Sequence, residues 1–429
     1  MWSPSRHLAR IVAMAVLLRT MSSPSSATDW PQWRGPDGTG VSHETSWNKE
    51  WPKDGPRALW KSNVGVGFSS VSVAAGRVFT LGFSSGNDTV FCFDAETGKE
   101  LWKQSYPCAL DDNYYEGGPN TTPSVDGEHV FTLSKRGDLF CFAVDSGKVV
   151  WKQNIVESIP ATKPEWGFAG SPLVWGDRLI LNVGGAGAAL SKSTGKLLWS
   201  SDTNTGGYAT PVGFGSGDSR AVAIFSGGGL VGVRPSDGHE LWRHPWVEEY
   251  KINAADPIFP TSTSVFLTSY GRGCALLSLE NSEPKEIWTN KNLAVGFNSC
   301  VFLDGYFYGI HGTADGTDKD VRCISATTGE LKWKQEKFGL GSLTAADGKL
   351  ILLSERGELV LAEASPSGFK AISRAQVLGG KCWTTPVLAN GRIYCRNAKG
   401  SLVCLDVRPS ASESAALPVS ARSASSPPK

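Results

Sequence analysis

A glycine followed four residues later by a tryptophan recurs along this chain and restricts its fold more than any other feature. The five clear pairs are Gly98 with Trp102, Gly147 with Trp151, Gly195 with Trp199, Gly238 with Trp242 and Gly329 with Trp333. Two altered copies have Pro284 before Trp288 and Ile372 after Gly368, and Trp60 begins the series. Successive copies lie 39 to 49 residues apart. Periods of this length are typical of solenoids and propellers.

Each repeat contains four short runs rich in β-branched and aromatic residues. Between Gly117 and Trp151 these runs are TTPSVDG, HVFTLS, LFCFAV and KVVWKQ, and they are separated by DG, KRGD and DSG. Such glycine-containing separators are hairpin signals. Four antiparallel strands per repeat make a propeller blade, so the sequence predicts an all-β fold of four-stranded antiparallel blades.

The two ends of the chain together complete the last blade. The strand through Trp60 has no inner strands before it, whereas residues 382–407 supply three strands without an outer one. We therefore predict an eight-bladed β-propeller over residues 57–407, closed by N- and C-terminal strands in one blade. This closure removes the open sheet edge that would otherwise invite aggregation.

The repeated tryptophans are interpreted as structural docking residues. A glycine in each short turn can adopt the positive φ that the hairpin needs. The tryptophan that follows is expected to cover the glycine-rich turn of the neighbouring blade and to bury a large aromatic surface there. The docking residues are Trp60, Trp102, Trp151, Trp199, Trp242, Trp288 and Trp333.

The segment DAETGKELW and its copies resemble the tryptophan-docking repeat of the pyrroloquinoline-quinone-like (PQQ-like) propellers. That family includes quinoprotein alcohol dehydrogenases and the outer-membrane protein assembly lipoprotein of Gram-negative bacteria. The chain also resembles secreted, stand-alone bacterial members in its segments WPQWRGPDGTG, YYEGG and GGKCWTTPVLANGRIYCRN. The resemblance is specific for the fold and implies two classes of function, a binding scaffold or a quinone-dependent enzyme.

The binding or scaffold class is favoured, with a pyrroloquinoline-quinone-dependent oxidoreductase as the alternative. Quinoprotein dehydrogenases typically carry two adjacent cysteines over the quinone and a carboxylate that binds calcium. This chain has no adjacent cysteines. Glu116, Glu165 and Asp256 are candidate calcium ligands by residue type, but each is more simply a hydrogen-bonding loop residue.

The N-terminus is typical of an exported protein. Arg6 and Arg10 precede the apolar run IVAMAVLL, and small residues end at Ala27, so residues 1–27 are expected to be a cleaved signal peptide. The assembly lipoprotein carries a lipid-anchoring cysteine, but in this chain no cysteine precedes Cys92. We expect a periplasmic or secreted monomer with an N-terminal extension at 28–56. The tail at 408–429 is rich in Ser, Ala and Pro and is expected to be disordered.

Charge and cysteine usage exclude several further classes. The net charge is +1, from 42 basic and 41 acidic residues, which gives no electrostatic footprint for nucleic acid. The histidines show no metal-ligand spacing, and the nine cysteines form no CxxC motif. Four of them share one strand position that is Ala189 and Gly232 in other blades, which indicates a site for a small buried side chain. These four are Cys92, Cys141, Cys323 and Cys404, and the pairing of the other five stays open.

Connections into the innermost strands carry the chemically richest residues. In a four-stranded blade the glycine turns lie on one face and these connections lie on the other, around the central channel. We predict a ligand-binding mouth there, suited to a small polar molecule, a glycan or a peptide stacked on an aromatic face. The candidate residues are Tyr115, Glu116, Asn120, Trp166, Tyr208, Asp256, Asn298, Lys381 and Trp383.

Overall fold

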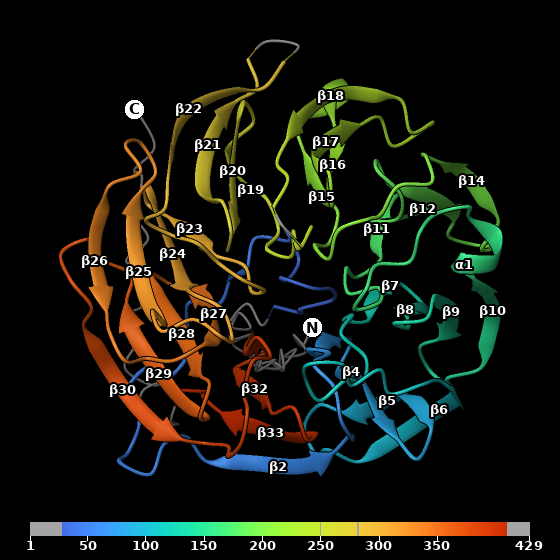
Figure 1. Cartoon of the computed structure of the whole chain (residues 1–429). Coiled ribbons are helices and arrows are strands. Elements are labelled where there is room, and N and C mark those ends of the chain that lie inside the picture. The colour runs from blue at the N-terminus through green and yellow to red at the C-terminus, as the bar shows by residue number, and fades with distance from the viewer. Residues whose placement is uncertain (1–27, 249, 281–282, 410–429) are drawn as a thin grey trace, which may run out of the picture.

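Eight four-stranded antiparallel sheets are arranged in a ring around a central channel (Figure 1). The computed structural model describes residues 28–248, 250–280 and 283–409. The eight-bladed β-propeller predicted from the repeat is therefore confirmed. The expected signal peptide at 1–27 and most of the tail at 408–429 lie outside the described residues.

Blades 1 to 4 follow one another along the chain. Blade 1 contains β3 (Ser72–Ala74), β4 (Arg77–Ser84), β5 (Asn87–Asp94) and β6 (Glu100–Pro107). Blade 2 contains β7 (Ser124–Asp126), β8 (His129–Leu133), β9 (Asp138–Ala143) and β10 (Val149–Asn154), followed by the short helix α1 (Ile155–Ser158). Blade 3 contains β11 (Leu173–Trp175), β12 (Arg178–Leu181), β13 (Ala188–Ser191) and β14 (Leu197–Ser200). Blade 4 contains β15 (Val212–Phe214), the 3-10 turn Gly217–Ser219, β16 (Ala221–Ser226), β17 (Gly229–Val233) and β18 (Glu240–Pro245).

Blades 5 to 8 complete the ring. Blade 5 contains β19 (Ile258–Thr261), β20 (Ser264–Ser269), β21 (Gly273–Ser278) and β22 (Lys285–Asn290). Blade 6 contains β23 (Val301–Leu303), β24 (Tyr306–His311), β25 (Asp320–Ser325) and β26 (Leu331–Gln335). Blade 7 contains β27 (Gly341–Ala346), β28 (Lys349–Ser354), β29 (Glu358–Glu363) and β30 (Ala371–Gln376). Blade 8 contains β31 (Val387–Ala389), β32 (Arg392–Arg396), β33 (Ser401–Asp406) and the N-terminal β2 (Ala58–Asn63).

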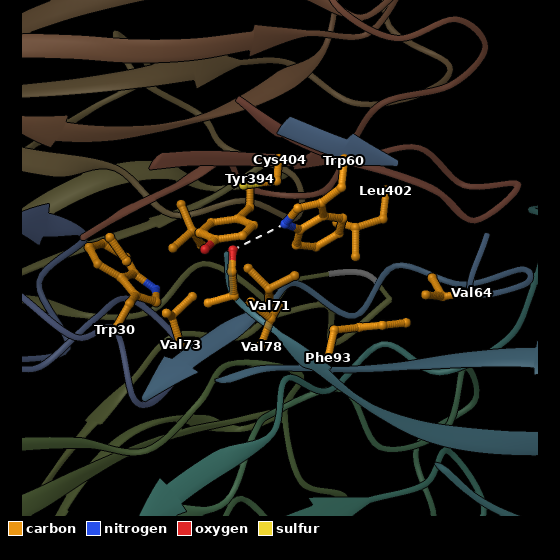
Figure 2. Close-up of a cluster of buried hydrophobic side chains, with 13 residues drawn as sticks. Trp30, Trp60, Val64, Val71, Val73, Val78, Phe93, Tyr394, Leu402 and Cys404 are labelled. Atoms are coloured by element: carbon orange, nitrogen blue, oxygen red, sulfur yellow. Dashed lines mark hydrogen bonds between the residues drawn. The ribbon is translucent and has the colours of Figure 1, made fainter. Parts of the chain in front are cut away.

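Blade 8 closes the ring by pairing the two ends of the chain. β2 runs antiparallel to β33, with Trp60 opposite Cys404, and Figure 1 shows the blue β2 beside the red β33. The Trp60 ring then packs between Tyr394 of its own blade and Phe93 of blade 1, at centroid distances of 5.9 and 6.0 Å (Figure 2). The closing blade is thus joined to blade 1 by a buried aromatic contact.

A buried arginine adds a second link at the same junction. Arg396 at the end of β32 is 1% exposed, and its guanidinium donates to Ser69 O at 2.8 Å, Thr80 Oγ1 at 3.0 Å, Leu81 O at 2.5 Å and Gly65 O at 3.1 Å. All four acceptors lie in blade 1 or in the segment that leads into it. Burial lowers the pKa of Arg396 to about 9.

The docking role of the tryptophans is visible at six blade junctions. Each indole N–H donates, at 2.7 to 3.1 Å, to a carbonyl three residues before the repeat's glycine position in the next blade. The pairs are Trp60 with Ala95, Trp102 with Val144, Trp151 with Lys192, Trp199 with Pro235, Trp288 with Ala326 and Trp333 with Ser365. At these six junctions an indole and its hydrogen bond therefore contribute to fixing one blade to the next.

Gly147 shows why the turn needs glycine. Its φ is 67°, which side chains disfavour, and a Cβ there would lie 2.5 Å from the Trp102 indole. Trp242 departs from the pattern. Its ring packs against Phe214 and over Gly232 of its own blade. In the following blade, Pro284 occupies the position that glycine has in the other repeats.

The shared cysteine position lies directly opposite the docking residue. Cys92, Cys141, Cys323 and Cys404 face Trp102, Trp151, Trp333 and Trp60 across the outer strand pair, as Ala189 and Gly232 face Trp199 and Trp242. Six of the seven docking tryptophans thus face a small side chain, and Trp288, which faces Leu276, is the exception. All nine cysteines are unpaired, which settles the pairing that the sequence left open.

The N-terminal extension crosses the end of the channel that carries the glycine turns. Trp30 exchanges two backbone hydrogen bonds with Val73 of β3, and β1 (Val41–Ser42) adds a parallel strand to β27 of blade 7. Trp47 is 4% exposed and packs into the core shared by blades 7 and 8. The extension therefore connects blades on several sides of the ring.

We expect Gly147→Ala to destabilise the protein more than Gly127→Ala. Gly127, in a turn of the same blade, has a φ of 56° but open space around its Cβ position. Both changes strain a left-handed residue by about 1 to 2 kcal/mol. Only Gly147→Ala also forces a methyl group into the indole, which adds about 1 to 3 kcal/mol. Urea denaturation of both variants measures the difference, and equal losses would show that the docking contact is loose.

Deleting residues 28–64 is expected to abolish cooperative unfolding. The deletion removes β2 and the extension, exposes β33 as an open edge and removes the Trp60 contact with blade 1. Circular dichroism during thermal denaturation, with size-exclusion chromatography, provides the measurement. A monomeric truncated protein with an unchanged transition would contradict the closure described above.

Candidate functional site

The nine predicted residues all lie in connections that lead into innermost strands, on the face opposite the glycine turns. Tyr115, Glu116 and Asn120 lie between β6 and β7, and Lys381 and Trp383 lie between β30 and β31. The remaining four lie in four further connections: Trp166 before β11, Tyr208 before β15, Asp256 before β19 and Asn298 before β23. Five of the nine, from two of the connections, meet at one end of the channel, here called the mouth.

A row of aromatic rings crosses the mouth. Tyr115 packs on Phe68 at 5.7 Å between centroids, Phe68 stacks on Trp383 at 5.8 Å, and Trp383 contacts Phe297 at 4.7 Å. These four residues, here called the aromatic row, come from four different connections. Consecutive planes differ by 29° to 44°, so the rings are tilted relative to one another.

Sequence reasoning missed Phe68 and Phe297. A signal existed, because both occur in the tripeptide VGF, four residues before the first residue of an innermost strand. The related segment WGF places Phe168, which is buried, in another connection. Aligning the connections by their distance to the innermost strand would have found this repeated phenylalanine.

An ion pair links two connections beside the aromatic row. Lys381 Nζ lies 2.9 Å from Glu116 Oε2 and 4.3 Å from the centroid of the Trp383 ring. The Trp383 indole donates to Glu355 Oε1 at 3.1 Å, and Asn120 donates to the Tyr115 hydroxyl at 3.2 Å. The side chains of Lys381 and Glu116 are 30% and 31% exposed, so the pair remains open to solvent.

Trp166 and Tyr208 form a second aromatic pair, with centroids 5.9 Å apart. The Tyr208 hydroxyl accepts a long hydrogen bond of 3.4 Å from the Trp166 backbone N–H, and burial raises the pKa of Tyr208 to about 12. Asn298 lies beside Phe297 and donates to Gly341 O at 2.5 Å. The prediction thus brings together five residues directly and a further three in adjacent connections.

Asp256 is separated from this surface. It is 3% exposed and accepts from Trp33 Nε1 at 2.5 Å, the Thr210 N–H at 2.7 Å and Ser299 Oγ at 3.0 Å. The buried Arg34 of the extension lies 3.6 Å away. Burial raises the pKa of Asp256, and the Arg34 charge opposes that shift. Asp256 therefore holds the extension inside the channel.

Comparison with known proteins identifies the family. A family model described as "Outer membrane protein assembly factor BamB" (PQQ_2) matches residues 44–113, 111–335 and 317–411. The chain belongs to this PQQ-like propeller family. A search of curated protein sequences finds no match.

Solved structures resemble this PQQ-like propeller over most of their length. BamB from Moraxella catarrhalis has a TM-score of 0.62 at 16% identity, covering 82% of this chain and 98% of that one. The quinohemoprotein alcohol dehydrogenase from Comamonas testosteroni has a TM-score of 0.59 at 15% identity, covering 88% and 80%. A europium-containing methanol dehydrogenase has a TM-score of 0.63 at 13% identity, covering 88% and 89%. At these identities the likeness shows a shared fold.

The dehydrogenase relatives raise the question of whether this propeller fits pyrroloquinoline quinone and calcium. The three candidate calcium ligands do not form a set, because Glu116 pairs with Lys381, Asp256 pairs with Arg34, and Glu165 is exposed. Within residues 28–248, 250–280 and 283–409, no group of three or more His, Cys, Asp or Glu could hold a metal ion. These residues do not fit the calcium of a quinone site.

Two cavities of the propeller differ in size and in position. A cavity beside Asp256 and Trp33 has a volume of about 40 Å³, far below the 300 to 1,000 Å³ typical of ligand pockets. A larger groove of about 520 Å³ lies at the outer edge of blades 7 and 8, beside Lys61, Gln376 and Val403. Neither the cavity nor the groove is lined by Tyr115, Lys381 or Trp383. A cavity shared by the predicted polar residues of the mouth therefore stays a prediction.

A buried lysine anchors the loop that carries Tyr115 and Glu116. Lys135 is 1% exposed, and its Nζ donates to Asp111 O at 2.7 Å and lies 4.8 Å from the Tyr115 ring centroid. Burial lowers the pKa of Lys135 to about 8. Asp88 nearby is also 1% exposed, and burial raises its pKa to about 6. Lys135 therefore fixes the loop from beneath the mouth.

No helix in the described part of the chain is long and apolar enough to cross a membrane. The mouth gathers side chains from several connections close to solvent. Its components are aromatic faces, one amide and one solvent-exposed ion pair, which suit recognition of a ligand.

Asp88→Asn is expected to stabilise the protein at neutral pH and to have little effect near pH 4. Since the pKa of Asp88 is about 6 in the folded state and about 4 in an unfolded chain, folding favours the protonated form. Stability is therefore lost as pH rises from about 4 to about 6, by up to about 3 kcal/mol. Asparagine removes this loss while Lys135 keeps its carbonyl partners.

Urea midpoints across this pH range measure the effect. Asp112→Asn, an exposed change in the same loop, is the control and should leave the midpoint unchanged at every pH. If the two variants behave alike, the buried carboxylate is not destabilising.

Proposed function

We propose that this PQQ-like propeller is an exported binding protein that recognises a ligand at the mouth of its channel. The observation that carries the proposal is the convergence of the aromatic row with the Glu116–Lys381 ion pair. Aromatic faces stack on the apolar face of a ligand, while a few placed polar groups fix its orientation. A small polar molecule, a glycan or a peptide side chain fits this description.

The geometry of the mouth supports binding without catalysis. Glu116 and Lys381 form an ion pair at 2.9 Å, so each charge is neutralised by the other. The adjacent Trp383 indole is already held by Glu355. Groups paired in this way act by position and charge, as recognition requires.

The sequence supports export. Arg6 and Arg10 precede a short apolar run in residues 1–27, a pattern typical of a signal peptide, and these residues lie outside the described structure. A periplasmic or secreted location agrees with this leader. The related BamB is described as an outer membrane protein assembly factor, and this propeller is proposed to share its role as a scaffold rather than its particular partners.

Trp383→Ala should abolish ligand binding at the mouth while leaving the fold intact. The test is a ligand-observed NMR screen of the full chain against defined sugars, amines and short peptides. Tyr250→Ala is the matched control, since Tyr250 is an aromatic residue 63% exposed in another connection on the same face. The expected result is binding that Trp383→Ala loses and Tyr250→Ala retains.

The same protein separates binding from the oxidoreductase alternative. Pyrroloquinoline quinone with calcium should give no thermal shift and no dye reduction with a panel of alcohols. Quinone-dependent dye reduction would overturn the proposal in favour of the enzyme. If Trp383→Ala and Tyr250→Ala both bind a ligand as well as the wild type does, the binding site lies away from the mouth.

A further inference from the structure

We propose that the mouth is a binding site for organic cations, in which the ammonium group of Lys381 occupies the place of the ligand. This inference rests on the proposed binding function and specifies its ligand class. The structure itself supplies the guiding observation, because an ammonium group already lies over the Trp383 ring against a carboxylate. The class of ligand is a quaternary or alkylated ammonium group.

The contacts of the Lys381 ammonium group define the site. Its Nζ lies 4.3 Å from the Trp383 ring centroid, within the distance at which a cation is attracted by the electron-rich face of an aromatic ring. Glu116 Oε2 at 2.9 Å supplies the opposite charge. Aromatic faces are what proteins use to recognise quaternary ammonium groups, and the Glu116 carboxylate adds an opposite charge here.

Neighbouring rings extend the surface beyond one indole. Phe68 and Phe297 flank Trp383 at centroid distances of 5.8 and 4.7 Å, tilted by 29° and 38°. Tyr115 continues the row on the far side of Phe68. Three methyl groups on a nitrogen present more apolar area than an ammonium group, so an alkylated cation would gain contact with these rings that Lys381 does not make.

The local charge favours a cation. Two carboxylates lie at this part of the row: Glu116 pairs with Lys381, and Glu355 accepts from the Trp383 indole. Lys381 is the one cation that contacts them in these interactions. Lys135 also lies over Tyr115, but it is 1% exposed and is held by the carbonyls of Leu110 and Asp111. The accessible part of the aromatic row therefore carries more negative than positive charge.

Exchange between Lys381 and a ligand requires only a side-chain movement. The Lys381 side chain is 30% exposed and has a flexible four-carbon stem. Its backbone carbonyl accepts a hydrogen bond from Ala398, which the side-chain movement leaves in place. Lys381 thus competes with a ligand for the same position and lowers the apparent affinity of the wild-type protein.

Choline is the probe, and its uncharged carbon isostere, dimethylbutanol, is the control ligand. Titrations of the full chain followed by calorimetry at fixed ionic strength compare the wild type with Lys381→Ala. We expect choline to bind Lys381→Ala about fivefold or more tighter than the wild type, because the competing ammonium group is gone. Dimethylbutanol should bind both proteins much more weakly than choline.

Further variants test the two halves of the site in the Lys381→Ala background. Glu116→Gln should weaken choline binding about fivefold by removing the charge, and Trp383→Ala should abolish it by removing the ring. In the wild-type background, Lys399→Ala is the control for Lys381→Ala: it removes an exposed lysine from the same blade and face and should leave choline affinity at the wild-type value. Unchanged urea midpoints confirm that each variant is folded.

Two results would overturn the inference: equal affinity for choline and dimethylbutanol, or no gain in choline affinity on removing Lys381. If either occurs while a sugar or peptide still depends on Trp383, the mouth binds another class of ligand and the proposed function stands. If no ligand of any class depends on Trp383, the proposed function fails with it.

Discussion

The ring depends on an indole lying over the glycine turn of the next blade. Each such contact combines a buried aromatic face with one hydrogen bond to a carbonyl three residues before the repeat's glycine position, as Trp102 does with Val144. Stability in a repeat protein is set by interfaces between neighbours, and this contact supplies part of the interface at six of the eight junctions. The residue opposite the tryptophan is cysteine in four blades, alanine or glycine in two more, and Leu276 in blade 5.

This regularity explains why the fold could be predicted from one sequence. The period of the glycine–tryptophan pairs, the hairpin signals and the unmatched strands at the two ends determine the number of blades and the closure, and β2 pairs with β33 as expected. The exception at Trp242 has a local cause that the sequence also shows, because Pro284 replaces the glycine on which the indole would lie.

The site was predictable only in part. Alternation of strand direction places every connection on one face, which is why Tyr115, Glu116, Lys381 and Trp383 could be grouped before their contacts were known. The pairing of Glu116 with Lys381 joins residues 265 positions apart and depends on how the ring closes. The burial of Asp256 could not be predicted in the same way. Its partner Arg34 belongs to the N-terminal extension, and no repeat specifies the path of that segment.

The extension also bears on where a ligand can be bound. At the end of the channel that carries the glycine turns, Trp33 and Arg34 reach inward to Asp256, and the space left beside them is about 40 Å³. A ligand binds tightly only where it can bury surface area and meet suitably positioned polar groups. A cavity with room for one or two water molecules is too small for that. The opposite end keeps an ion pair in contact with solvent above a row of rings. These two observations place the proposed recognition site at the mouth, where solvent reaches both the aromatic row and the ion pair, and not inside the channel.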